Sequence, residues 1–305
     1  MATPSLFTSV LALSILLAAL SSCGETSHAV DGEHGDAGIH IAGDLHVAGR
    51  LILREGAQLG ATKHGDAGSH VLAQGPGEHV DTHWSYEKDD GPEHWGSLDA
   101  AWKVCGEGRS QSPIDFVGAD VSNLNPVDFS YRTIPLRIKN NGHTLQVDTE
   151  GSGGVLFGTK EYALIQFHFH SPSEHRIDGK AFPMVAHLVH KSADGELLVV
   201  GVPLEGGEKN MTLETIWRHF PRETSATKFH DNVVFSVDAL LPVDRSYYMY
   251  IGSLTEPPCA EGVRWVFLRS PVSISQRQIA VFKRAFPKSV RPVQPINGRT
   301  VGQGR

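Results

Sequence analysis

The sequence has little of what marks nucleic-acid-binding or membrane-spanning proteins. Its formal net charge is −7, and its Lys and Arg residues form no run, so a nucleic-acid partner is not expected. Its most apolar stretch, residues 11–20, is too short to cross a bilayer comfortably. The composition, 40% hydrophobic and 20% charged over 305 residues, allows one large domain with additional segments.

The chain has only three cysteines, and the first of them follows the apolar stretch. Residues 20–23 read LSSC, which resembles a bacterial lipoprotein box, in which the cysteine becomes the lipidated first residue of the mature chain. Residues 1–10 contain no Lys or Arg, which departs from the usual basic start of a signal peptide. We expect residues 1–22 to be a signal peptide, with Cys23 as a lipid anchor on a periplasmic or cell-envelope protein. An ordinary cleaved signal peptide is the alternative.

Residues 23–80 lack the aromatic side chains that build a core. They are rich in Gly, His, Ala and Asp, and the heptad HGDAGIH at residues 34–40 recurs as HGDAGSH at residues 64–70. This composition is typical of a flexible linker. The alternative is an arm that gathers zinc through its histidines.

Residues 165–170, IQFHFH, alternate with period two and therefore predict a β-strand. The alternation assigns Gln166, His168 and His170 to one face, and Ile165, Phe167 and Phe169 to the other. Imidazoles at i and i+2 lie roughly 7 Å apart at the backbone and can share one metal ion. A second alternating run, residues 185–190, offers His187 as a third ligand. Three histidines without a fourth protein ligand are typical of a catalytic zinc site, although strand histidines are more often solvent-facing or simply hydrogen-bonded.

Three further motifs stand around this strand: QSPI at residues 111–114, SPSEH at residues 171–175 and GSLTEPPC at residues 252–259. Together with IQFHFH they resemble the α-class carbonic anhydrases of bacteria, over roughly residues 84–299. The resemblance implies a β-rich single domain, residues 81–305, with a large, twisted, mostly antiparallel central sheet and peripheral helices. Periodicity alone predicts strands between residues 127 and 202 and helices at residues 97–104, 211–220 and after a capping box at residues 275–278.

The same resemblance implies a zinc enzyme that reversibly hydrates CO2 to bicarbonate and a proton. It makes His168, His170 and His187 the Zn²⁺ ligands, and zinc-bound hydroxide the attacking group, as is established for this family. Thr255 and Glu174 match the pair that orients this hydroxide. His143 matches the proton shuttle.

Other positions match the family's pocket and its supporting residues. An apolar pocket for CO2 is expected from Val189, Val199, Leu254, Val263 and Trp265. Gln166 matches a residue that orients a ligand histidine, and Tyr86, Asn140 and Asn141 match positions that tether water near the shuttle. Export to an oxidising compartment makes Cys105 and Cys259 the natural disulfide pair, as in bacterial relatives.

Two positions depart from the family pattern. Val185 stands two residues before the third ligand, where the family usually has a glutamate that orients this imidazole. Glu256 stands beside the substrate pocket, where the family usually has a threonine or another small residue. The first departure predicts faster zinc exchange, and the second alters the charge beside the product.

Two other functions remain open from the sequence. One is a catalytically weak or silent binding protein on the same fold, since a fold does not fix a function. The other is a periplasmic zinc-handling protein that uses the His-rich arm. A zinc peptidase is disfavoured because residues 170–175 have neither the HExxH nor the HxxEH spacing.

Overall fold

The computed structural model describes residues 82–118 and 124–305. The expected signal peptide, the His-rich segment and Cys23 lie outside these residues. In order along the chain, the strands are β1 (Asp115–Phe116), β2 (Val127–Tyr131), β3 (Thr133–Asn140), β4 (Leu145–Asp148), β5 (Gly153–Phe157), β6 (Lys160–His170), β7 (Arg176–Ile177), β8 (Lys180–Ala181), β9 (Met184–Lys191), β10 (Leu197–Gly206), β11 (Lys228–Ser236), β12 (Tyr247–Ser253), β13 (Glu261–Leu268), β14 (Val272–Ile274) and β15 (Gly302–Gly304). The α-helices are α1 (Trp95–Leu98), α2 (Val104–Glu107), α3 (Met211–Trp217) and α4 (Gln276–Ala285), and the 3₁₀ helices are η1 (Lys88–Asp90), η2 (Ala100–Trp102) and η3 (Val237–Leu240).

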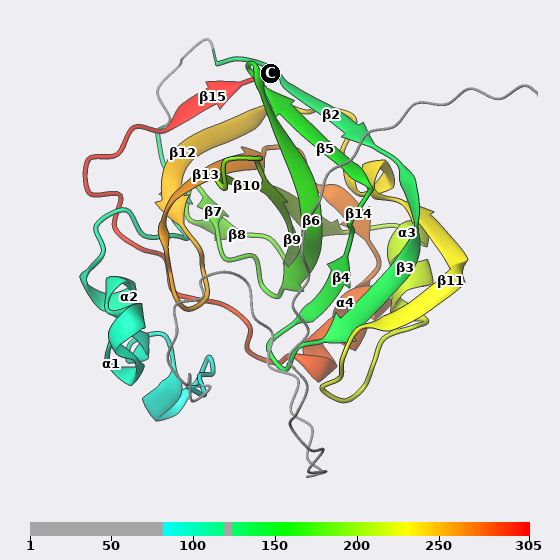
Figure 1. The fold of residues 1–305 in the computed structure, drawn as a ribbon, viewed down its shortest axis with the longest axis horizontal. Helices are drawn as coiled ribbons and strands as arrows, with labels where there is room; N and C mark the ends of the chain where they lie inside the picture. Colours follow the sequence, from blue (N-terminus) through cyan, green and yellow to red (C-terminus); the bar gives the residue numbers. More distant parts are fainter. Residues whose placement is uncertain (1–81, 119–123) are drawn as a thin grey trace, which may run out of the picture. The chain divides into compact units, whose positions relative to one another are not determined.

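Twelve strands form one twisted sheet, which confirms the expected fold class (Figure 1). Its main path runs β11-β3-β4-β6-β9-β10-β13-β12-β15, and most neighbours are antiparallel. Two pairs of strands in this sheet are parallel, β10 with β13 and β10 with β14. A small sheet, β1-β7-β8, lies apart from this path. The strands β6 and β9 are therefore central, with neighbours on both sides.

The helices agree with the prediction in part. Ser275 and Gln278 form the expected capping box at the start of α4, whose Ile279 and Phe282 are buried in the core. The single helix expected at residues 97–104 is wrong, because Asp99 adopts an extended backbone between α1 and η2. Its side chain accepts a hydrogen bond from the backbone N–H of Ala101 and so starts a new turn. No helix among the described residues is both long and apolar enough to cross a membrane.

The alternation in β6 is interrupted by a bulge. Leu164 pairs with His190 and Gln166 pairs with Val189 on β9, so Ile165 is an extra residue between them. The prediction that Ile165 shares a face with Phe167 and Phe169 is wrong for this reason: Phe167 and Phe169 belong to the main core, whereas Ile165 packs on the opposite face, in the apolar cluster around Trp265. Because the bulge lies before Gln166, His168 and His170 still point to the same face of β6.

Candidate metal centre

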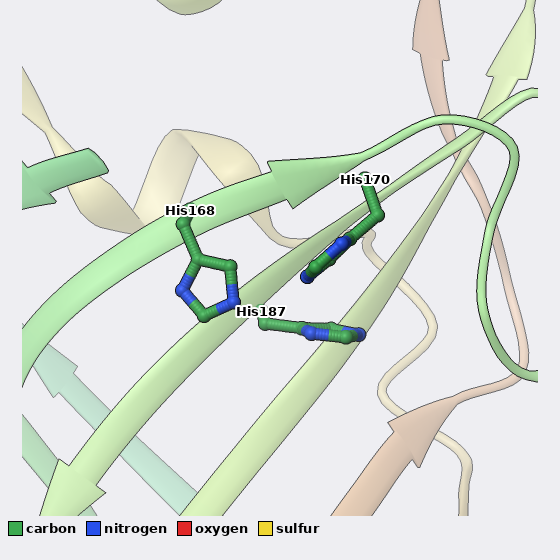
Figure 2. A group of neighbouring side chains, drawn as sticks. All are labelled: His168, His170 and His187. Atoms are coloured by element: carbon green, nitrogen blue, oxygen red, sulfur yellow. The ribbon is translucent and has the colours of Figure 1, made fainter. Parts of the chain in front are cut away.

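Two adjacent central strands bring three histidines together. His168 on β6 stands directly opposite His187 on β9 in the antiparallel register, and His170 lies two residues further along β6 on the same face. One ring nitrogen from each lies within 4.8 Å of the others, and the three imidazoles converge on one point (Figure 2). The sheet register thus builds the predicted ligand set without any loop.

Hydrogen bonds fix which nitrogen two of these rings present. His168 Nδ1 lies 2.9 Å from Gln166 Oε1, and His170 Nδ1 donates to the backbone carbonyl of Ser289. Because both acceptors are oxygens, each Nδ1 carries its hydrogen and each Nε2 keeps a lone pair. Burial lowers the pKa of both imidazoles, so both are neutral at pH 7. His170 Nε2 is also buried, with no hydrogen-bond partner among the described residues, as expected of an atom that binds a metal.

His187 is held differently from the other two rings. Its Nδ1 faces Glu174 Oε2 at 3.8 Å, and its Nε2 is buried without a hydrogen-bond partner among the described residues. Val185, the residue two positions earlier on the same strand face, is fully buried and offers no acceptor. The third imidazole therefore lacks the oriented hydrogen bond that the first two have.

A buried carboxylate lies beside two of the three rings, those of His170 and His187. Glu174 is 2% exposed, and its Oε2 lies 3.6 Å from His170 Nε2. It accepts a hydrogen bond from the backbone N–H of Arg291, at 2.9 Å, and the Thr255 hydroxyl lies close enough to favour its charged form. Burial raises the pKa of this carboxyl to about 8 against the opposing effect of these two groups. The predicted Thr255–Glu174 pair is thus brought together beside the ligands, and a cation there would favour its ionised form.

A second carboxylate, Glu256, is held by a hydrogen bond from a residue far away in the sequence. Tyr86 Oη donates to Glu256 Oε1 at 2.9 Å, a contact between residues 170 positions apart. Burial, followed by the charge of Glu256, raises the pKa of the Tyr86 hydroxyl well above its ordinary value, so the hydroxyl stays protonated and donates. The charge of Glu256 also raises the pKa of His170 against the effect of burial.

The expected apolar wall forms one cluster on the ligand face of the sheet. Trp265 lies 4.9 Å from His187, ring centre to ring centre, which places this cluster directly against the metal centre. Four of the five predicted residues, Val189, Val199, Val263 and Trp265, belong to this cluster, and the partly buried Leu254 packs against it.

The predicted shuttle, His143, stands at the turn between β3 and β4. Its imidazole stacks on Trp84 with ring centres 3.7 Å apart, and burial lowers its pKa to about 4. Asn140 and Asn141, predicted to tether water, accept backbone hydrogen bonds from Gly142 and His143 and so shape this turn. Their predicted role with water stays a prediction.

The disulfide holds the loop that carries Thr255. Cys105 and Cys259 are joined, as expected, and Cys259 N–H donates to the Glu256 carbonyl at 2.9 Å. Around the disulfide lies an aromatic cluster that includes Trp84, Tyr86 and Trp95. The loop beside the ligands is therefore tied covalently to α2.

Two backbone groups that hold side chains of this site were not predicted from the sequence. The Ser289 carbonyl orients His170, and the Arg291 N–H binds Glu174, but backbone groups carry no side-chain signature that a sequence could reveal. His175 and His190 are not among the ligands: both are buried and contact tyrosine hydroxyls, at 2.7 Å and 2.8 Å respectively.

Proteins of known family are similar to this chain over most of its length. Residues 90–304 match the model of the eukaryotic-type carbonic anhydrase family. A carbonic anhydrase of Klebsiella pneumoniae is 40% identical over 79% of this chain and 98% of its own length, and one of Nostoc sp. is 40% identical over 72% and 84%. The solved structure of the α-carbonic anhydrase of Thermovibrio ammonificans with the inhibitor sulfanilamide has a TM-score of 0.70 and 42% identity, over 72% of this chain and 99% of that one.

Proposed function

The chain belongs to the eukaryotic-type (α) carbonic anhydrase family, and from this premise we propose that it hydrates CO2 reversibly at a zinc ion held by His168, His170 and His187. The observation that carries the metal assignment is the convergence of three neutral imidazoles, with ligand atoms within 4.8 Å. These donors fit zinc, which favours neutral imidazole nitrogen. A zinc ion bound by three neutral imidazoles supplies one open position and makes a water molecule held there more acidic.

Thr255 and Glu174 orient the attacking water in this proposal. In this proposal the Thr255 hydroxyl, which lies close enough to Glu174 to favour its charged form, donates its only hydrogen to that carboxylate, so toward the metal side it can only accept. A water molecule near the ligands must therefore direct a hydrogen at Thr255 Oγ1, which leaves an oxygen lone pair free to attack. Such preorganised orientation lowers the barrier without further rearrangement.

The apolar cluster supplies the place for the second reactant. CO2 carries no net charge, so it is expected to prefer Val189, Val199 and Trp265 over the polar side of the centre. His143 accepts the proton that the reaction releases. Stacked on Trp84 it is neutral, with its pKa at about 4, and exposure to solvent would return the pKa to its ordinary range.

We propose that the chain is exported and anchored through lipid on Cys23. The disulfide between Cys105 and Cys259 supports an oxidising compartment. Palmitate labelling of the wild type and of Cys23→Ala would test the anchor, and equal labelling of both would exclude it.

Metal removal tests the proposed mechanism. Dialysis against a chelator should abolish CO2 hydration, and one equivalent of zinc should restore it. Thr255→Ala should lower kcat while zinc content is unchanged, and Thr255→Ser, which keeps the hydroxyl, should retain most of the rate. Loss of zinc in Thr255→Ala would instead assign this residue a structural role.

A further inference from the structure

The metal centre has an additional carboxylate, Glu256. It has no role in the proposed function, in which three histidines bind the metal and Thr255 and Glu174 orient the water. Glu256 directly follows Thr255, which lies beside Glu174, and Glu174 Oε2 lies 3.6 Å from His170 Nε2. Leu254, two residues before Glu256, packs against the apolar cluster whose Trp265 ring centre lies 4.9 Å from that of His187. The loop thus places Glu256 beside the metal centre, and its charge acts on His170.

The position of this carboxylate is fixed by three connections. Tyr86 Oη donates to Oε1 at 2.9 Å, and the Glu256 carbonyl accepts from Cys259 N–H at 2.9 Å. Cys259 is in turn bonded to Cys105 on α2. Burial raises the pKa of the Glu256 carboxyl, and the hydrogen bond from Tyr86 acts against this by favouring the charged form. Because Tyr86 is neutral, it does not cancel the charge of the carboxylate as a Lys or Arg partner would. No salt bridge to Glu256 is found among the described residues.

The charge balance of the centre changes as a result. A divalent cation, three neutral imidazoles, the Glu174 carboxylate and the Arg291 guanidinium whose charge acts on it sum to +2, and the Glu256 carboxylate reduces this sum to +1. A bound cation favours the ionised form of both carboxylates, since an opposite charge within a few ångströms does so. The centre then attracts anions less strongly through its net charge.

We infer that Glu256, held by Tyr86, is a specificity-determining residue that makes this metal centre bind anions, including the bicarbonate product, more weakly, while leaving its affinity for uncharged CO2 unchanged. The inference rests on the proposed zinc site. A unit charge several ångströms away, at the effective dielectric constant that applies near protein sites, changes anion affinity by roughly 10- to 100-fold. The enzyme should accordingly release bicarbonate readily and resist inhibition by small anions.

Anion binding to the cobalt-substituted full-length chain tests this inference. Cobalt in a three-histidine site of low coordination absorbs visible light far more strongly than six-coordinate cobalt on exposed histidines, so the band reports on this centre alone. Thiocyanate would be titrated into the wild type, Glu256→Gln, Tyr86→Phe and the control Glu150→Gln. Glu150 has a side chain that is 92% exposed and lies in the turn between β4 and β5.

Glu256→Gln should bind thiocyanate roughly 10- to 100-fold more tightly than the wild type, because it removes one negative charge from a side chain of equal size. Glu150→Gln should match the wild type. Tyr86→Phe removes the donor that favours the charged form of Glu256, so it should tighten thiocyanate binding, by no more than Glu256→Gln does. Equal affinity in Glu256→Gln and the wild type overturns the inference, and so does weaker binding by Tyr86→Phe than by the wild type. Failure of the wild type to develop the intense cobalt band refutes the proposed metal site itself, which is a different result.

Discussion

Replacing Val185 by glutamate should slow the loss of zinc from this protein. His187 Nε2 is buried and lacks a hydrogen-bond partner among the described residues, and the buried Val185 stands two residues earlier on the same strand face. His175 Nδ1 is another buried nitrogen without a hydrogen-bond partner among the described residues, and its ring centre lies 6.0 Å from that of His187. A glutamate side chain is long enough to accept a hydrogen bond from the His187 ring.

The size of the effect can be worked from two directions. Loss of an outer hydrogen-bond partner of a metal ligand typically costs about 10- to 100-fold in metal affinity. A buried donor left unsatisfied costs about 1–3 kcal/mol, which corresponds to roughly 5- to 150-fold. Both predict that Val185→Glu should slow zinc dissociation by about one to two orders of magnitude.

The assay is the transfer of zinc to a chromophoric chelator from fully loaded wild type, Val185→Glu and Val185→Leu. The leucine variant fills the same space without an acceptor and should release zinc as fast as the wild type. Thermal unfolding of each variant would show that the core tolerates the change, since overpacking can cost about 1–3 kcal/mol. Zinc loss from a folded Val185→Glu at the wild-type rate or faster would refute the reasoning.

Two further predictions concern the disulfide and the shuttle. Reducing the Cys105–Cys259 disulfide, which closes a loop with a sequence separation of 154, should lower the free energy of unfolding by up to ~5 kcal/mol; denaturant unfolding with and without reductant checks this, and an unchanged midpoint would contradict it. Trp84→Ala should raise the pKa of His143 from about 4 toward its ordinary value, because the stacked ring that buries it is gone. A lowered histidine pKa costs the wild type stability as the pH falls from about 6.5 to 4, so the variant should lose this part of its acid sensitivity. Imidazole NMR titration measures the shift, and a pKa that stays near 4 would count against it.

Sequence periodicity was sufficient where side chains alternate on central strands. The run at residues 165–170 placed His168 and His170 on one face correctly, because strand geometry leaves few choices. It could not reveal the bulge at Ile165, since a bulge arises from the register with β9. Local structure caused a similar failure at Asp99, whose extended backbone ends α1 and whose side chain caps the start of η2.

The hydrogen bonds that hold the residues of the site in place were the feature that the sequence predicted least well. The contacts of Tyr86 with Glu256 and of Ser289 with His170 join residues 170 and 119 positions apart. Such contacts depend on the completed fold and leave no periodic signal. The departure at Val185 was visible in the sequence only through the family resemblance, and the unpartnered nitrogen of His187 now gives it a physical meaning.

Stopped-flow CO2 hydration by the full-length chain, with zinc determined on the same sample, tests the proposed zinc enzyme most directly. We predict rapid hydration with one tightly bound zinc per chain, and loss of both the tight zinc and the activity in His168→Ala. One tight zinc without hydration would contradict the proposed function and favour a binding protein on this fold. Several loosely bound zinc ions that His168→Ala leaves unchanged would instead assign zinc handling to histidines outside this centre.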